Sequence, residues 1–250
     1  MEHVEIAGAC IPALGFGTFE LDDTRACDLV RHALQRGYRH IDTAQMYGNE
    51  AGVGQAIRDA GVPRDEVFVT TKVWTDRFRD GDLQRSVTES LQRLGLGHAD
   101  LVLLHWPNPD VPLEESIGAL LDARNRGYTR FAGVSNFPSD LMREAAETAG
   151  PGELINNQVE YHPFLSQEAV RATAGALGMA VSAYCPLARG QVFRDAVLRR
   201  IGAKHGKNAG QVALRWLLDQ GVIALPRTAR KAHADANLDV FGFRLDAEDH

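Results

Sequence analysis

Residues 68–105 read FVTTKVWTDRFRDGDLQRSVTESLQRLGLGHADLVLLH and decide the fold class of this 250-residue chain. The stretch opens with an apolar run at 68–72, passes through a polar loop into residues 82–94, and closes with another apolar run at 100–105. The apolar residues of the middle segment share one helix face: Leu83, Val87, Leu91 and Leu94. The outer runs do not alternate with polar residues, which is typical of strands buried on both faces. The stretch therefore predicts a strand, a helix and a second strand of a parallel sheet.

The same alternation extends along the whole chain. We expect strands at 14–17, 40–42, 68–72, 100–105, 131–135, 156–160, 181–184 and 222–225. We expect helices at 24–35, 49–59, 82–94, 114–124, 139–148, 166–177, 195–205 and 209–219. Eight strands alternating with helices at this length are typical of a (β/α)8 TIM barrel, an α/β fold. No linker interrupts the pattern, so residues 1–250 are expected to form one barrel domain. Segments 4–6 and 11–13 are expected to form a short N-terminal β-hairpin that closes the bottom.

The main alternative is an open, doubly wound parallel sheet. That fold usually marks its nucleotide site with a GxGxxG motif after the first strand. Here Gly15 and Gly17 begin such a motif, but Glu20 stands where the third glycine belongs. The sequence therefore favours the closed barrel.

The composition excludes several classes of function. Hydrophobic residues make up 44% of the chain and charged residues 24%, with a net charge of −6, as in an ordinary globular protein. This mild acidity is not typical of proteins that bind nucleic acid, which carry basic patches. No apolar run is long enough to span a membrane. Three scattered cysteines, Cys10, Cys27 and Cys185, indicate a reducing cytoplasm. Neither CxxC nor HExxH occurs, so no metal site is expected.

Polar residues end several of the predicted strands. Asp42, Lys72 and His105 close the second, third and fourth strands, about one strand–helix unit apart. Active sites of (β/α)8 barrels are built at the C-terminal ends of the strands, so these side chains should meet at one mouth, with Tyr47 in the loop after Asp42. Each residue alone also fits a structural role, as an ion pair for Asp42 and Lys72 or a buried core histidine for His105.

Together these four residues predict acid catalysis. Tyrosine has a pKa near ~10 and is a poor proton donor at neutral pH. A nearby Lys72 ammonium would stabilise the tyrosinate and lower the pKa of Tyr47, and Asp42 would keep Lys72 charged. Tyr47 is therefore expected to be a general acid, with His105 hydrogen-bonded to the substrate oxygen.

Six strings of the sequence carry a family resemblance. They are GYRHIDTAQMYGNEAGVGQAI (37–57), TTKVW (70–74), LLHWP (103–107), GVSNF (133–137), NQVEYHP (157–163) and AYCPLARG (183–190). In this order and spacing, from Gly15 to about Asn237, the chain resembles the aldo-keto reductase superfamily. Within that family it looks most like the small bacterial 2,5-diketo-D-gluconate and methylglyoxal reductases.

The resemblance implies a carbonyl reductase that takes hydride from NADPH without metal or flavin. The family's catalytic tetrad falls on Asp42, Tyr47, Lys72 and His105. Eight residues would hold the nicotinamide and the pyrophosphate: Gly17, Thr18, Ser135, Asn136, Gln158, Tyr184, Leu187 and Arg189. The substrates would be small aldehydes, ketoaldehydes or keto sugars. Four residues would line their pocket: Phe19, Met46, Trp74 and Trp106, although the two tryptophans also fit ordinary packing.

The segment LPRTARKAHADANL, residues 225–238, resembles the family's loop and helix for the adenosine phosphate. Arg227 and Thr228 replace the usual Lys and Ser and can still bind a phosphate, and Asn237 matches the family. The usual Arg is His233 here, and the usual Glu is Ala236. Since imidazole binds phosphate less well than guanidinium, NADPH is the expected cofactor and NADH stays open.

Two other functions stay open. One is a cofactor-binding barrel protein with little turnover, because fold alone does not set function. The other is an aldolase that uses Lys72 as a Schiff base, which requires a neutral lysine. The resemblance also implies a monomer. Family members usually continue beyond the point where this sequence stops, so the barrel is expected to lack the family's C-terminal tail.

Overall fold

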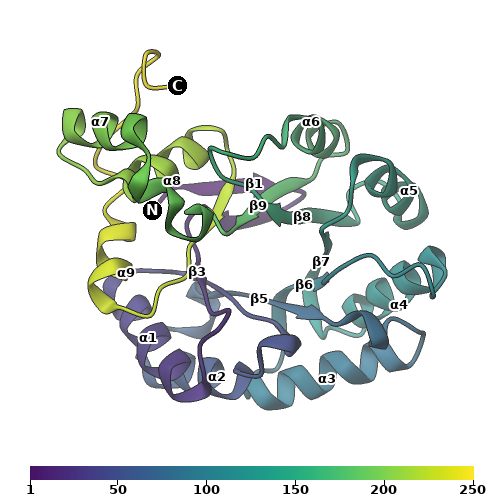
Figure 1. Cartoon of the computed structure of the whole chain (residues 1–250). Helices are drawn as coiled ribbons and strands as arrows, with labels where there is room; N and C mark the ends of the chain where they lie inside the picture. The colour runs from purple at the N-terminus through teal and green to yellow at the C-terminus, as the bar shows by residue number, and fades with distance from the viewer.

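A parallel sheet of eight strands curls into a barrel in the computed structural model, which describes residues 1–250 (Figure 1). The strands are β3 (Phe16–Gly17), β4 (His40–Asp42), β5 (Phe68–Val73), β6 (Ala99–Leu104), β7 (Thr129–Ser135), β8 (Leu154–Glu160), β9 (Ala180–Tyr184) and β10 (Ile223–Leu225). Each strand pairs with the next one along the chain. The first and last strands then meet, because Gly15 N donates to Ala224 O at 2.9 Å and Ala224 N donates to Ala13 O at 2.8 Å. This closure confirms the barrel and excludes the open sheet.

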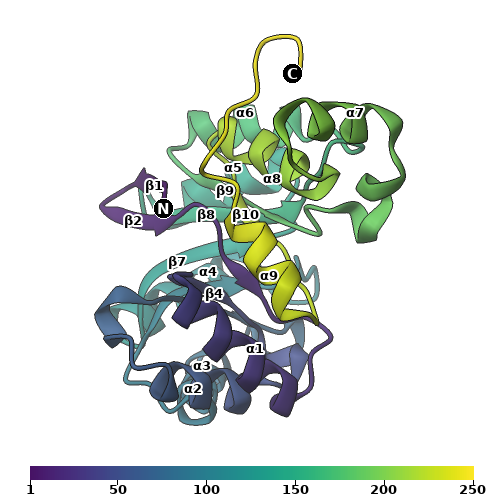
Figure 2. The same cartoon turned by 90° about the vertical axis from the view of Figure 1, so that its left-hand side faces the viewer.

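Helices surround the barrel on the outside (Figures 1 and 2). They are α1 (Asp23–Arg36), α2 (Glu50–Asp59), α3 (Asp82–Leu94), α4 (Leu113–Asn125), α5 (Ser139–Ala149), α6 (Glu168–Ala176), α7 (Ala196–His205), α8 (Ala209–Asp219) and α9 (Lys231–Leu238). The main core is a cluster of 49 buried apolar residues from both the helices and the strands. None of the helices combines the length and the apolar character that a membrane span needs.

Local sequence chemistry sets the helix ends. The Asp22 side chain accepts from Arg25 N at 2.9 Å and caps α1, and Gly37 ends that helix at a φ of 109°. At the start of α8, the Asn208 side chain accepts from Gln211 N at 3.0 Å, and the Gln211 side chain accepts from Asn208 N at 2.9 Å. This reciprocal capping box satisfies two backbone donors that the helix itself leaves free.

The predicted N-terminal hairpin is confirmed. Strands β1 (His3–Ile6) and β2 (Ala9–Pro12) pair antiparallel and lie at the N-terminal end of the barrel (Figure 2). Ile11 of the hairpin belongs to a second apolar cluster, which includes Phe68 and Leu103 of the barrel strands. The hairpin therefore covers the barrel floor with apolar side chains, and the opposite end is left for polar chemistry.

Several predicted boundaries differ from the observed ones by one or two residues. The first strand is shorter than 14–17, because Leu14 pairs with Ala224 through a single bridge and the regular ladder covers only Phe16–Gly17. His105 lies just after β6 rather than at its end, although its backbone N still donates to Val73 O at 3.1 Å. The predicted helix at 166–177 begins only at Glu168.

Candidate active site

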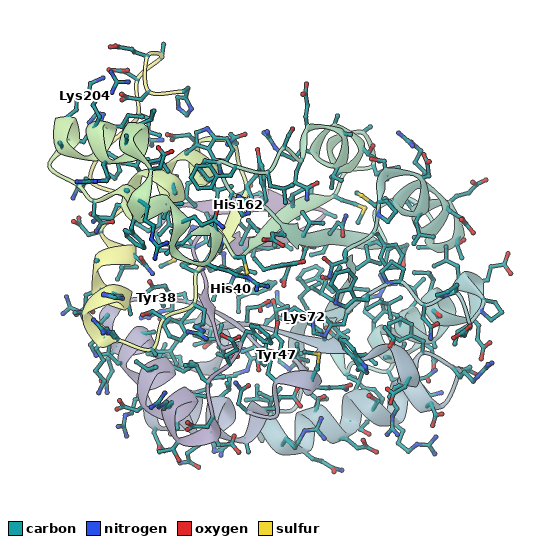
Figure 3. The ribbon with its side chains drawn as sticks, in the orientation of Figure 1. Tyr38, His40, Tyr47, Lys72, His162 and Lys204 are labelled. Carbon is teal, nitrogen blue, oxygen red and sulfur yellow. The ribbon has the colours of Figure 1, made fainter.

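Lys72 lies at the centre of a buried cluster at the C-terminal ends of the strands (Figure 3). Its ammonium Nζ donates to Asp42 Oδ1 at 2.6 Å, to Thr43 O at 3.0 Å and to the Tyr47 hydroxyl at 3.1 Å. These three acceptors match the three donors of a charged lysine. Burial, the largest single effect, favours the neutral amine, but the Asp42 carboxylate and the Tyr47 oxygen together outweigh it and raise the pKa of Lys72. The Schiff-base alternative, which requires a neutral lysine, has no support in this geometry.

Tyr47 ends a short 3-10 helix, η1 (Gln45–Tyr47), in the loop after β4. Burial raises the pKa of the Tyr47 hydroxyl, and the nearby charge of Lys72 only partly opposes this effect. The prediction of a lowered pKa was therefore wrong in its direction, because desolvation of the tyrosinate outweighs the attraction of one ammonium. The hydroxyl keeps its proton at neutral pH. Because its oxygen accepts from Lys72, that proton remains free for donation.

His105 faces the same cluster with a neutral ring. Burial, and next the positive charge of Lys72, lower the pKa of His105 to about 3. The ring lies edge-on to Tyr47, with centroids 5.8 Å apart, and to Trp74, with centroids 5.1 Å apart. Its buried Nδ1 has no hydrogen-bond partner in the protein. The imidazole therefore keeps hydrogen-bonding capacity that a bound group can use.

Gln158 and Ser135 extend this cluster along β8 and β7. Gln158 Nε2 donates to Asp42 Oδ2 at 2.8 Å, which leaves the amide oxygen of Gln158 free. Ser135 Oγ donates to the backbone oxygen of Gln158 at 2.8 Å. Two residues that the resemblance assigns to the nicotinamide are thus hydrogen-bonded to each other, and one of them, Gln158, is also hydrogen-bonded to Asp42.

Asn136 and Tyr184 form the next part of the network. Tyr184 donates its hydroxyl to Asn136 Oδ1 at 2.9 Å, and Asn136 Nδ2 donates to His105 O at 3.0 Å. Burial raises the pKa of Tyr184 to about 12, so this phenol stays neutral. Asn136 has a φ of 63°, a left-handed conformation that asparagine tolerates better than most residues with a Cβ.

Gly17 and Thr18 lie at the end of β3 with their side-chain positions turned into the protein. A Cβ on Gly17 would come within 3.2 Å of Leu225 O, so glycine permits the close approach of β3 to β10. Thr18 is fully buried, and its Oγ1 donates to Asp42 O at 3.0 Å. Both residues thus support the frame around Asp42.

Leu187 and Arg189 lie in the loop after β9. Leu187 is half-buried and packs against the main core, whereas Arg189 is exposed and forms no ion pair with a carboxylate. Cys185, Ala188 and Arg189 all have positive φ values, between 46° and 51°. Because Arg189 forms no ion pair, its guanidinium can bind an anion.

The four predicted adenosine-phosphate residues lie together after β10. Arg227 Nε donates to Phe19 O at 2.8 Å, and its guanidinium forms an ion pair with Glu20. Thr228 accepts from Arg230 N at 3.1 Å, just before α9. Within α9, His233 is exposed and Asn237 is buried.

The predicted substrate pocket is partly assembled around the tetrad. The Phe19 ring packs on Tyr47 with centroids 5.1 Å apart, and Trp74 packs on His105. Met46 and Trp106 are exposed, at 47% and 44% of their surfaces, and lie next to Tyr47 and His105 in sequence. Exposed apolar side chains next to buried polar ones are typical of a ligand pocket.

Sequence reasoning missed two amides that hold the Tyr47 loop. Gln45 Nε2 donates to Ser86 Oγ at 2.6 Å, while its Oε1 accepts from Trp74 N at 3.2 Å. Asn49 Nδ2 donates to Thr18 O at 2.8 Å. The only available signal was their place on either side of Tyr47 in TAQMYGNE.

A (β/α)8 barrel that brings together a tyrosine hydroxyl hydrogen-bonded to a charged lysine, a neutral histidine and uncharged amides at its C-terminal mouth has the groups that an oxidoreductase acting on carbonyl groups needs. The sequence model of the Aldo/keto reductase family matches residues 13–250. The chain belongs to the aldo/keto reductase family and uses a nicotinamide cofactor. It is therefore a carbonyl reductase, not a cofactor-binding barrel with little turnover.

Several known proteins are similar over nearly the whole chain. Methylglyoxal reductase DkgB of Escherichia coli O157:H7 is 42% identical over 96% of this chain and 90% of its own. A crystal structure whose protein has been inferred to be a 2,5-diketo-D-gluconic acid reductase B is 49% identical, with a TM-score of 0.97 over 100% of this chain and 89% of its own. A Bombyx mori aldo-keto reductase in complex with NADP is 35% identical, with a TM-score of 0.92 over 99% and 90% of the two chains.

Proposed function

We propose that this chain reduces small aldehydes, ketoaldehydes or keto sugars with NADPH, and that Tyr47 donates the proton. The observation that carries the proposal is the position of Lys72 Nζ, 2.6 Å from Asp42 Oδ1 and 3.1 Å from the Tyr47 hydroxyl. This arrangement gives a protonated phenol a fixed cation beside its oxygen. Schiff-base chemistry would instead need Lys72 as a neutral amine.

Each residue of the tetrad has a separate task. The bound cofactor supplies the hydride that reaches the carbonyl carbon. Tyr47 gives its proton to the carbonyl oxygen, and the Lys72 ammonium stabilises the tyrosinate that is left. Asp42 keeps Lys72 charged and aimed at Tyr47. His105, neutral at physiological pH, orients the carbonyl oxygen by a hydrogen bond. Proton transfer and polarisation are thus assigned to side chains, and we propose no metal.

The chain's own residues fit a nicotinamide dinucleotide. Beside the Asp42–Lys72 pair lie uncharged polar groups that can exchange hydrogen bonds with a carboxamide, and they come from four residues: Ser135, Asn136, Gln158 and Tyr184. Farther out, Arg189 and Arg230 are exposed and unpaired, which suits phosphates. The Nδ1 atom of His105 is buried and has no partner in the protein, so it can still form a hydrogen bond with a bound group. Gly17, Thr18 and Leu187 would complete the nicotinamide and pyrophosphate site through backbone and apolar contacts.

The cofactor preference depends on the adenosine end. Arg227, Thr228 and Asn237 retain the pattern that the family uses for a 2′-phosphate, which supports NADPH. His233 and Ala236 differ from the Arg and Glu that are usual in the family, so we propose that the preference for NADPH over NADH is small.

The substrate class follows from the pocket and from the relatives. Phe19, Trp74 and their exposed neighbours present an apolar mouth. Arg77 pairs with Glu89 at 3.0 Å and Arg79 pairs with Glu115 at 3.7 Å, so a substrate carboxylate would compete with these glutamates for either arginine after Trp74. The similar proteins carry the names of a methylglyoxal and a diketogluconate reductase. We further propose that residues 1–250 act as a monomeric, single-domain enzyme in the cytoplasm.

The test is oxidation of the reduced nicotinamide, followed by absorbance, with methylglyoxal and 4-nitrobenzaldehyde. Each substrate is offered with NADPH and with NADH. We expect turnover with both substrates and a modest preference for NADPH. Tight cofactor binding without any aldehyde-dependent oxidation would contradict the proposal.

A further inference from the structure

An ion pair inside the protein occupies Arg227, one of the residues proposed for the cofactor phosphate. The guanidinium of Arg227 binds the Glu20 carboxylate, and Arg227 Nε donates to Phe19 O at 2.8 Å. Glu20 belongs to the loop after β3, and Arg227 follows β10, so the pair joins the two loops at the seam of the barrel. The partners are partly exposed, with 63% of the Glu20 side chain and 34% of the Arg227 side chain accessible.

The backbone of Glu20 lies in an unusual conformation. Its φ of 59° lies in the left-handed region, which disfavours a residue with a Cβ. Arg227 is fixed from the other side, because Gly17 and Arg227 form a parallel bridge. At the seam of the barrel, the Glu20 carboxylate thus pairs with the guanidinium of Arg227, which the 2′-phosphate of the cofactor would need.

The other cations of this region are not all free either. Lys231 Nζ donates to Asp28 Oδ1 at 2.7 Å, whereas Arg230 and His233 make no ion pair. A phosphate that binds here therefore meets one free guanidinium and one already neutralised guanidinium. It also meets the negative charge of Glu20, which repels it.

We propose that Glu20 is a specificity-determining residue, an internal carboxylate that competes with the cofactor's 2′-phosphate for Arg227. The inference rests on the proposed function, in which Arg227 takes part in binding NADPH. A dinucleotide with a 2′-phosphate has to displace or tolerate Glu20, whereas one without that phosphate does not. Glu20 thus weakens the binding of NADPH but not that of NADH, so the ratio of the two affinities becomes smaller.

The experiment is a calorimetric titration of the purified chain, and of its variants, with NADP⁺ and with NAD⁺. Glu20→Gln removes the charge at nearly constant size, and Glu20→Asn does so with a residue that tolerates left-handed backbone. Because the pair is partly exposed, we expect NADP⁺ to bind about three- to tenfold more tightly to both variants, with NAD⁺ within about twofold of the original chain.

The matched control is Glu66→Gln. Glu66 also pairs with an arginine, Arg39, at 3.3 Å and with 53% of its side chain exposed, but it precedes β5 at the opposite end of the barrel. The control changes net charge equally and should leave both cofactor affinities unchanged. A second control is the double variant Glu20→Gln with Arg227→Gln, in which the gain from losing Glu20 should disappear.

Three results would overturn the inference. They are unchanged or weaker NADP⁺ binding in both Glu20 variants, equal tightening for NADP⁺ and NAD⁺, and a gain that persists without Arg227. If the unaltered chain bound neither dinucleotide, the proposed function would fail first, so the two failures are distinguishable.

Discussion

The side-chain amide of Gln158 donates a 2.8 Å hydrogen bond to Oδ2 of Asp42, across 116 residues of sequence. The other oxygen of the same carboxylate, Oδ1, accepts from Lys72 at 2.6 Å. A residue proposed to hold the nicotinamide is therefore joined directly to the residues proposed to tune the proton donor. This contact makes cofactor binding and proton transfer parts of one polar network.

Removing Gln158 should affect both functions. In Gln158→Leu, Asp42 Oδ2 loses its donor while buried, which costs about 1–3 kcal/mol of folding free energy. We expect a lower melting temperature together with weaker binding of NADP⁺, measured by thermal unfolding and by titration. As a control, Gln167→Leu removes a glutamine that donates to Glu160 O, outside this network. Normal cofactor affinity in Gln158→Leu would argue against the assigned role.

Removing the proton donor should abolish turnover and leave binding intact. Tyr47→Phe keeps the ring against Phe19 and His105, but it lacks the hydroxyl that Lys72 contacts. Since general acid catalysis contributes roughly 10²–10⁴-fold, we expect the rate of carbonyl reduction to fall by about that factor. Cofactor affinity should stay within about twofold. Tyr128→Phe, at the turn before β7, is the control, and equal activity in the two variants would refute the assignment.

The Asp42–Lys72 pair should show the behaviour of a buried ion pair. Lys72→Met leaves the Asp42 carboxylate buried without its cation, and we expect a loss of about 3–5 kcal/mol in unfolding free energy. The double variant Asp42→Asn with Lys72→Met removes both charges and should recover much of that loss while remaining inactive. Denaturant unfolding and the reductase assay separate these effects. Recovery of activity in the double variant would show that neither charge serves the chemistry.

The pH dependence of reduction should be set by Tyr47 on the alkaline side. A general acid must be protonated, so kcat/KM should fall as the pH rises through the pKa of Tyr47, which burial raises above its usual value of 10.0. His105, with its pKa lowered to about 3, should produce no inflection near neutrality. A pH–rate profile for 4-nitrobenzaldehyde tests both statements, and an acidic limb near pH ~6.5 would contradict the neutral, buried state of His105.

His105 should also make the fold acid-sensitive. Its pKa is about 3 in the folded chain against 6.5 as an unperturbed group, so the unfolded chain binds the extra proton first. The contribution of the neutral His105 to the free energy of unfolding is therefore fully present above pH ~6.5 and declines as the pH falls towards about 3. In His105→Gln this contribution is absent, and the melting temperature should fall less between pH ~7 and pH ~4.5. Parallel curves for the two proteins would rule out the linkage.

A guanidinium in place of His233 should strengthen the preference for NADPH. His233 is exposed on α9, so an arginine there adds a cation to the proposed phosphate site without disturbing the core. We expect the NADPH to NADH ratio of kcat/KM to rise about three- to tenfold in His233→Arg. His3→Arg makes the same substitution on the N-terminal hairpin at the other end of the barrel. An unchanged ratio in His233→Arg would mean that the phosphate is bound elsewhere.

The sequence by itself determined the barrel and the meeting of the tetrad. Unalternating strands at regular intervals predict a parallel sheet, and eight of them close it. Because parallel strands share one C-terminal edge, spacing alone predicts that Asp42, Lys72 and His105 converge. Tyr47 follows Asp42 by five residues, so the sequence predicts that it lies in the loop after the second strand, at the same edge. These features depend on local periodicity and on topology, both of which the order of residues contains.

Only the tertiary structure decided how these groups behave. The direction of the Tyr47 pKa shift depends on whether desolvation or the Lys72 charge is larger, and that balance is a property of burial in three dimensions. The contacts of Gln158 with Asp42 and of Arg227 with Glu20 join distant segments whose side chains carry no periodic signal. A sequence specifies which residues reach a barrel mouth. The packing around them decides which atoms form contacts, which charges are paired and which groups lose their contact with water.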